Sequence, residues 1–260
     1  LLRAAVAGAL DTRPGLEKQV RRMLAHPHAE ALATRFGGQF LRLQDVDKIQ
    51  PDALLYPSFD ADLAAGFKRE TELLFNSIVR EDRNVLDLLT ADYTFVNERV
   101  AKVYGIPNVA GPASRRVTLT DPNRRGILSH GSVLLQTSIA DRTSPVHRGK
   151  WIMEVLLGSP PPPPPPNIPA LEQTDATSSD GKPLTVRARM EQHRANPSCN
   201  SCHRFIDPLG LSLESFDVIG ASRIKDSGAP VDTAAKLWDG SDLSGPSSLP
   251  PALLRYSEPM

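Results

Sequence analysis

The stretch "YPSFDADLAAGFKRETELLFNSIVRED", residues 56–82, decides the fold class. Its apolar residues recur at three- and four-residue spacing, which is the period of one buried face of an α-helix. Ser58 or Asp60 is expected to cap the N-terminus, because short polar side chains accept hydrogen bonds from the first amides of a helix. The sequence therefore predicts a long amphipathic helix. Its buried stripe includes Leu63, Phe67, Leu74 and Ile78.

Helical patterns occur along most of the chain. Pro27 should break the one that starts at Leu16, and residues 85–107 should form two short helices that meet near Asp92. A later helix should be capped by Ser144 and ended by Gly158. We expect little sheet, confined to the last third, and a mainly α fold. The helical stretches are residues 16–43, 56–82, 85–107, 121–138, 144–158 and 184–196.

Charge and hydropathy exclude several classes of protein. Among 260 residues, 30 basic side chains balance 30 acidic ones, which argues against binding nucleic acid through bulk charge. The sequence has no apolar run of the about eighteen residues that a membrane-spanning helix needs. It starts without methionine, so we expect a portion of a longer product, with any signal peptide upstream.

A proline run suggests how the chain is divided. Seven consecutive prolines, Pro160 to Pro166, should form an extended polyproline II rod of about 20 Å. We therefore expect a helical domain over residues 1–158, a rod and loop over residues 159–183, and a smaller segment over residues 184–260. That last segment is expected to be the cofactor-binding part.

The smaller segment contains the motif "NPSCNSCHRF", residues 196–205, with both cysteines of the chain, Cys199 and Cys202, followed by His203. This spacing matches c-type haem attachment, in which two thiols bond the porphyrin and the histidine binds iron. A redox disulfide uses the same Cys-x-x-Cys but normally sits beside a strand–helix unit, which is missing here. Structural zinc needs four ligands, and only His193 is near enough in sequence to be the fourth. Chance placement is the remaining alternative.

Three longer stretches carry a resemblance to a known family. They are "RARMEQHRANPSCNSCHRFIDPLGLSLESFDVIGASR", "ETELLFNSIVREDRNVLDLLTADYTFVNERVAKVYGIP" and "RTSPVHRGKWIMEVLLGSPPPPPPPNIPALE". They resemble exported cytochrome-like proteins of Planctomycetes and Acidobacteria that are built from consecutive domains of unknown function of the DUF1592 and DUF1588 type. The resemblance covers about Phe36 to Arg223. It implies a cytochrome-like segment and further domains of the same polypeptide.

The motif and the resemblance together predict one haem c, with thioether bonds to Cys199 and Cys202 and with His203 as proximal iron ligand. Haem attachment in bacteria takes place outside the cytoplasmic membrane, so we expect a periplasmic or extracellular protein. The expected role is electron transfer with other haem or redox proteins or subunits. The alternatives are a peroxidase- or dehydrogenase-like haem enzyme with an open sixth site, and a zinc-stabilised scaffold module.

We expect six-coordinate iron, and the sixth ligand separates these functions. His193 is the leading choice, because six extended residues can reach around a porphyrin edge. Met190, one helical turn earlier, is the alternative, followed by His147, His130 and Met153.

Several charged residues have two possible roles. Three basic side chains in or just before the helix at residues 144–158 could bind haem propionates or could simply be solvated. An acid pair after the cysteine motif, Glu214 and Asp217, more simply caps and solvates a helix. The propionate candidates are Arg142, Arg148 and Lys150.

Overall fold

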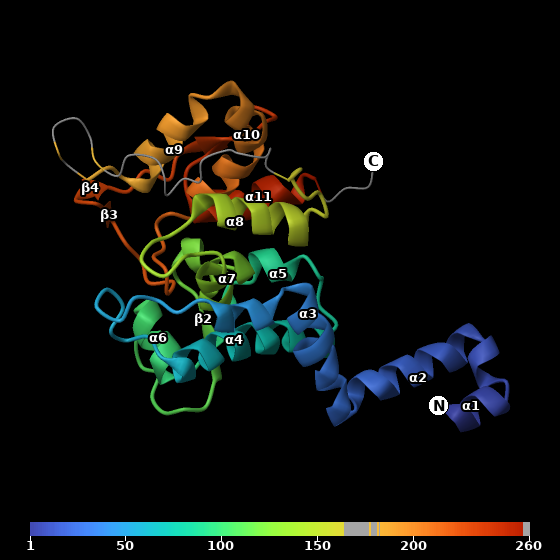
Figure 1. Cartoon of the computed structure of the whole chain (residues 1–260). Coiled ribbons are helices and arrows are strands. Elements are labelled where there is room, and N and C mark those ends of the chain that lie inside the picture. Colours follow the sequence, from blue (N-terminus) through green and yellow to red (C-terminus); the bar gives the residue numbers. More distant parts are fainter. Residues whose placement is uncertain (164–176, 178–180, 182, 257–260) are drawn as a thin grey trace.

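The computed structural model describes residues 1–163, 177, 181 and 183–256. Figure 1 shows two stacked groups of helices and an arm that projects from the lower group. The lower group is built around α4, and the upper group contains α8, α9, α10 and α11. The described chain is helical with short strands, so the predicted mainly α fold is confirmed. Residues 164–166 of the expected proline rod lie outside the described residues.

Each helical stretch that the sequence analysis expected contains at least one of the helical elements. Those before the rod are α1 (Leu2–Val6), η1 (Ala9–Asp11), α2 (Arg13–Ala25), η2 (Pro27–Glu30), η3 (Leu32–Gly37), α3 (Gly38–Phe40), η4 (Leu43–Lys48), α4 (Ala61–Arg80), α5 (Asp87–Thr90), α6 (Glu98–Tyr104), η5 (Pro122–Arg124), η6 (Ile127–Ser129), α7 (Gly131–Gln136), α8 (Pro145–Trp151) and η7 (Ile152–Leu156). Those after it are α9 (Val186–Arg194), α10 (Pro197–Leu211), η9 (Pro246–Ser248) and α11 (Leu249–Leu254).

Helix α4 is the central element of the lower group. Asp60 caps it, because its carboxylate accepts a hydrogen bond from the amide of Leu63 at 2.9 Å. All four apolar residues of the expected stripe are buried. Two other expectations are also confirmed: α2 ends before Pro27, and the Ser144 hydroxyl caps α8 by accepting from the amide of His147 at 3.3 Å.

The first half of the chain contains an antiparallel pair of strands, with α6 between them in sequence, that the sequence analysis missed. Strand β1 (Tyr93–Val96) pairs with β2 (Arg115–Thr118) in an antiparallel ladder. The expectation that sheet is confined to the last third was therefore wrong. Aromatic and β-branched residues such as Tyr93, Thr94 and Phe95 favour strands, and burial of Tyr93 and Val96 against α4 stabilises this one. The described later strands are β3 (Lys225–Asp226), β4 (Ala229–Pro230), β5 (Ala235–Lys236) and β6 (Asp242–Leu243).

Helices α8 and α10 cross with their backbones in contact. A Cβ atom on Gly149 would lie 2.0 Å from the carbonyl oxygen of Ile206, and one on Gly210 would lie 1.8 Å from that of Pro145. Glycine at these two positions therefore allows the close approach. The largest apolar cluster also joins the two groups, since it contains Leu74 of α4 and Leu209 of α10. The domain boundaries given above stay a prediction.

Helix α10 runs through Pro208, although an Asp-Pro pair commonly favours a turn. A proline inside a helix lacks one hydrogen-bond donor and costs about 3 kcal/mol. The residues from Ile206 to Leu211 are all buried, many of them where α10 packs on α8. This packing outweighs the local cost of the proline.

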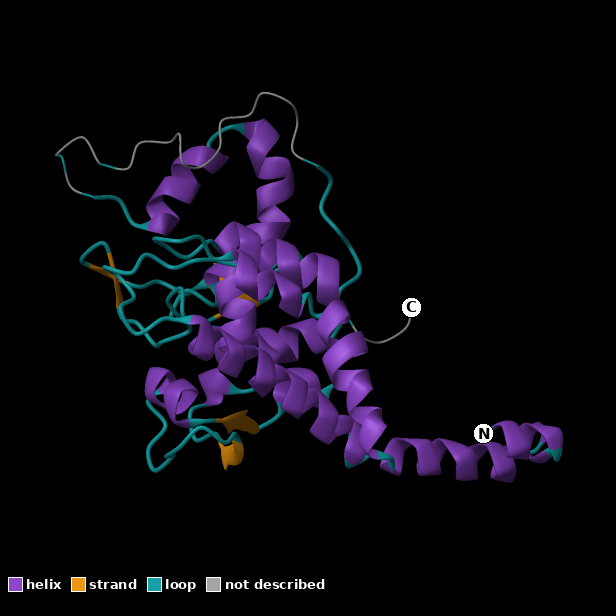
Figure 2. Ribbon diagram, turned by 60° about the horizontal axis from the view of Figure 1, so that its bottom comes forward, coloured by secondary structure: helices purple, strands orange, loops and turns teal. Residues whose placement is uncertain are grey.

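The arm consists of residues 1–25. None of the residues in α1, η1 or α2 is buried. Figure 2 shows the same projection from a second direction, with the arm leading away from the helical body.

Candidate functional site

The cysteine motif occupies the first half of α10. The Asn196 side chain caps this helix by accepting from the amide of Ser198 at 2.9 Å, and Pro197 occupies the first helical position. Cys199 and Cys202 are three residues apart on the helix, so their side chains share one face. Cys199 is buried, Cys202 is partly buried, and both are free thiols. Two thiols one helical turn apart suit attachment to a single planar group.

A buried carboxylate orients the imidazole of His203. Its Nδ1 lies 2.8 Å from Oδ1 of Asp207, one helical turn later, and Asp207 is completely buried. In the described part of the chain, no hydrogen bond reaches Nε2 of His203. Metal-binding histidines typically donate one ring N–H to a carboxylate, which fixes the tautomer and makes the other nitrogen a better ligand. These residues therefore fit an iron ligand at His203.

Arg194, at the end of α9, contributes to the same cluster. Its Nε lies 3.5 Å from Oδ2 of Asp207, which makes no hydrogen bond with the described residues. A partly exposed guanidinium at this distance offsets some of the cost of burying the carboxylate.

His193 and Met190 lie in different surroundings. The ring of His193 makes a T-shaped contact with that of His203, with 5.1 Å between centroids. Burial and the neighbouring His203 lower the pKa of His193. Two rings in direct contact leave no space for a porphyrin between them, so α9 would have to move for His193 to be the sixth ligand. Met190 is buried in a small apolar cluster with Val186 and Leu211.

The described residues around the cysteine motif do not form the ligand set of a closed zinc site. Among the described residues, no group of three or more histidine, cysteine, aspartate or glutamate side chains is arranged to hold a metal ion. His193 lies beside His203, but the two cysteines and two histidines do not converge on one point.

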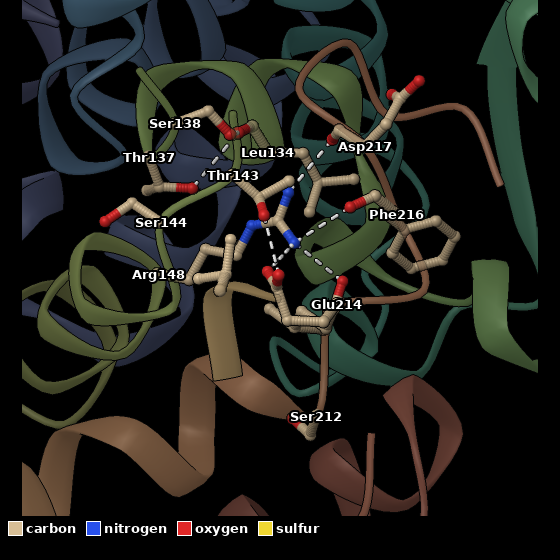
Figure 3. Close-up of polar contacts among 12 residues, drawn as sticks. Leu134, Thr137, Ser138, Thr143, Ser144, Arg148, Ser212, Glu214, Phe216 and Asp217 are labelled. Atoms are coloured by element: carbon tan, nitrogen blue, oxygen red, sulfur yellow. Dashed lines mark hydrogen bonds and ion pairs between the residues drawn. The ribbon is translucent and has the colours of Figure 1, made fainter. Parts of the chain in front are cut away.

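Helix α8 holds the end of α10 through Arg148. This guanidinium is fully buried, and it donates to the carbonyl oxygens of Leu213 at 2.8 Å, Phe216 at 3.1 Å and Asp217 at 3.0 Å (Figure 3). It also donates to Oε1 of Glu214 at 2.8 Å. Arg148 is therefore neither a propionate ligand nor a solvated charge, and both interpretations of its sequence position were wrong.

Glu214 completes this buried network instead of capping a solvated helix. Its Oε2 accepts from the hydroxyl of Thr143 at 2.7 Å and from Arg223 at 2.6 Å. Figure 3 shows the carboxylate of Glu214 directly below the guanidinium of Arg148 and the hydroxyl of Thr143. Because two guanidiniums share one buried carboxylate, the network fixes the chain that follows α10. Its role is structural.

Two family models match the chain, one before residue 107 and one after residue 123. Residues 1–106 match the model of the domain PSD4, described as a protein of unknown function (DUF1592). Residues 124–226 match PSCyt3, described as a protein of unknown function (DUF1588). The chain contains a DUF1592 domain followed by a DUF1588 domain. Comparisons with curated proteins and with solved structures gave no match.

The His203–Asp207 cluster and the Arg148–Glu214 network both lie within the residues that match DUF1588. A third polar cluster contains residues from both matched regions. Glu70 of α4 is completely buried in it. Its carboxylate accepts from the hydroxyls of Thr94 and Tyr104, each at 2.6 Å. Burial raises the pKa of Glu70 from 4.5 to about 7. The sequence analysis missed this cluster, although Glu70 lies on the apolar stripe of α4, between Phe67 and Leu74.

The DUF1588 side of this third cluster contains His130 and Arg124. Nδ1 of His130 lies 2.8 Å from the hydroxyl of Thr71, and Nε2 lies 3.7 Å from Oε1 of Glu70. Burial lowers the pKa of His130 to about 3, so the ring is neutral. The guanidinium of Arg124 lies over the ring of Tyr104 at 4.3 Å. With both nitrogens inside this buried network, His130 is a poor candidate for the sixth iron ligand.

Proposed function

We propose that the DUF1588 domain carries one haem c on α10 and transfers single electrons. Cys199 and Cys202 would form the thioether bonds, and His203 would bind the iron through Nε2. The observation that carries this proposal is the hydrogen bond between His203 and the buried Asp207. His203 directly follows Cys202, whose thiol shares a helix face with that of Cys199. The name of the matching domain, PSCyt3, is in keeping with a cytochrome-like role.

Each residue has a distinct task in this proposal. Haem supplies one-electron redox chemistry, whose potential depends on the axial ligands and on their hydrogen bonds. The carboxylate of Asp207 accepts a hydrogen bond from Nδ1–H of His203. This bond orients the ring and increases electron donation from Nε2. Asn196 and Pro197 start the helix directly before the two thiols. Arg148 of α8 holds the segment that follows α10 by donating to its carbonyl oxygens.

The same chemistry supports a cellular location and a class of partner. Covalent haem attachment in bacteria takes place outside the cytoplasmic membrane, so we propose an exported protein. Its partners would be other haem or redox proteins, or further domains of the same polypeptide. Within the described residues, no helix is long and apolar enough to cross a membrane.

Mass and absorption measurements test the attachment. Protein produced with a bacterial haem-attachment system should exceed its apoprotein mass by about one haem under denaturing conditions. It should also give the pyridine haemochrome spectrum of a haem c. Cys199→Ser and Cys202→Ser should each lose one thioether bond, whereas Ser201→Ala on the exposed side of α10 should keep both. An unmodified mass with two free thiols, or with one bound zinc, would contradict the proposal.

The sixth ligand is tested separately. If His193 is that ligand, His193→Ala should convert a low-spin spectrum to a high-spin one and admit cyanide. An unchanged low-spin spectrum would instead direct the search to Met190. A wild-type protein that is already high-spin and binds cyanide would favour the alternative of a haem enzyme with an open site.

Asp207→Asn tests the positioning role of Asp207. The neutral amide accepts a weaker hydrogen bond from Nδ1–H than the carboxylate does, so Nε2 becomes a weaker electron donor to the iron. The thioether bonds should remain, and the reduction potential of the attached haem should rise. An unchanged potential in this variant would show that Asp207 does not tune the ligand.

A further inference from the structure

The arm presents an apolar face that the described residues leave about half exposed. Leu16, Val20, Met23 and Leu24 recur along α2 at the spacing of one helix face. Leu16, Val20 and Met23 are 50%, 46% and 47% exposed. Figures 1 and 2 both show the arm leading away from the body, and only its end, where Arg80 donates to the carbonyl oxygen of Leu24, contacts α4 in the described chain. Such a face in water favours association.

A second uncovered apolar surface lies on the body. It is a groove of about 590 Å³ between the loop before α5, the end of η7, and α11. Among its described lining residues there is no charged side chain. Five of them are more than a third exposed, which leaves the groove open to solvent. These five are Phe40, Val85, Leu86, Trp238 and Tyr256.

The charges around the two surfaces are of opposite sign. Residues 1–25 contain five basic side chains and two acidic ones. The loop at residues 81–87, which supplies Val85 and Leu86 to the groove, contains three acidic side chains and one basic one, and with Arg116 paired to Glu81 the local net charge is −1. Opposite potentials favour encounter and fix orientation when two surfaces meet.

We propose that two copies of this chain associate by exchanging arms. The apolar face of α2 from one copy lies in the groove of the other, and its basic residues face the acidic loop at residues 81–87. An amphipathic helix laid into an apolar groove is a common mode of recognition. In a pair related by twofold symmetry the contact occurs twice, so each arm covers the partner's groove.

Sedimentation velocity over a concentration series tests the exchange. The wild-type chain, whose protein mass is 28.3 kDa, should sediment as a dimer at the upper end of the series. Val20→Glu in the arm and Val85→Glu in the groove should each give a monomer over the same range. Both sites are exposed, so neither change should unfold the body. The matched controls Gln19→Glu and Asn84→Asp add the same charge beside the surfaces and should leave the dimer.

Mixing the two monomeric variants gives the decisive result. The Val85→Glu chain retains an intact arm, and the Val20→Glu chain retains an intact groove, so the mixture should form a one-to-one pair through one of the two contacts. A wild-type monomer at every concentration would overturn the proposal, even if its arm bound anionic lipid vesicles. So would a dimer that persists in both variants, or a mixture that stays monomeric.

Discussion

Glu70→Gln should reveal a pH dependence of stability that the wild-type protein conceals. The pKa of Glu70 is raised by burial from 4.5 to about 7, so the folded state holds this proton more tightly than the unfolded state. The resulting stabilisation is complete below pH 4.5 and is lost as the pH rises to about 7. At 1.36 kcal/mol per pKa unit, it amounts to about 3 kcal/mol.

His130 works in the opposite direction. Its pKa is lowered by burial from 6.5 to about 3, so its contribution is complete above pH 6.5 and is lost as the pH falls toward 3. This loss amounts to about 5 kcal/mol. Between pH 4.5 and 6.5 the two slopes have equal size and opposite sign. The wild-type free energy of unfolding should therefore change little in this interval on account of this pair.

Glutamine resembles the protonated carboxyl: its oxygen can accept from one of the two hydroxyls of Thr94 and Tyr104, and its NH2 can donate to the other, but it does not titrate. In Glu70→Gln the His130 slope is no longer opposed, and the free energy of unfolding should rise by about 3 kcal/mol from pH 4.5 to 6.5. Urea unfolding followed by circular dichroism at half-unit pH intervals measures this. The exposed Glu17→Gln serves as control and should follow the wild type. If Glu70→Gln also follows the wild type across this interval, Glu70 does not hold its proton as argued.

Three further substitutions test the packing. Gly149→Ala should lower the free energy of unfolding by at least about 1–3 kcal/mol, because the new Cβ would lie 2.0 Å from the carbonyl oxygen of Ile206. Gly38→Ala is the control and should not destabilise, because its Cβ would lie 3.9 Å from the nearest atom. Equal unfolding midpoints for the two variants would contradict the backbone contact. Arg148→Met should cost about 3–5 kcal/mol in urea unfolding, because it leaves Glu214 buried with one cation fewer. Lys150→Met on the exposed face of α8 is its control, and a similar small loss in both would refute the role of Arg148. Asp60→Ala should lower the thermal midpoint through a loss of about 1 kcal/mol, because α4 loses its cap, and an unchanged midpoint would argue against that cap.

The sequence predicted what depends on local periodicity and on caps. The apolar spacing of α4, its cap at Asp60 and the start of α8 at Ser144 are set by neighbours within one or two turns, so a single sequence contains them. The cysteine motif was found in the same way, because its chemistry depends on spacing along one helix.

What the sequence could not show depends on contacts between distant segments. Strand β1 exists because it meets β2 some twenty residues later, and Pro208 is tolerated because α8 packs on that half of α10. Arg148 resembled an ordinary surface charge, since its partners lie more than sixty residues away. Glu70 did leave a trace, because a glutamate on the buried stripe of a helix requires partners.

The two halves of α10 differ in burial, and this difference has a consequence for how the helix opens. Most residues of its first half are exposed, although Cys199 is buried, whereas Ile206 to Leu211 are all buried on α8. Local openings of a folded protein need little free energy where few apolar contacts are broken. Amide hydrogens near Cys202 should therefore exchange with solvent through local fraying, and those near Leu209 should exchange only when the whole domain unfolds. The thiols lie in the half of the helix that can open while the rest of the domain remains folded.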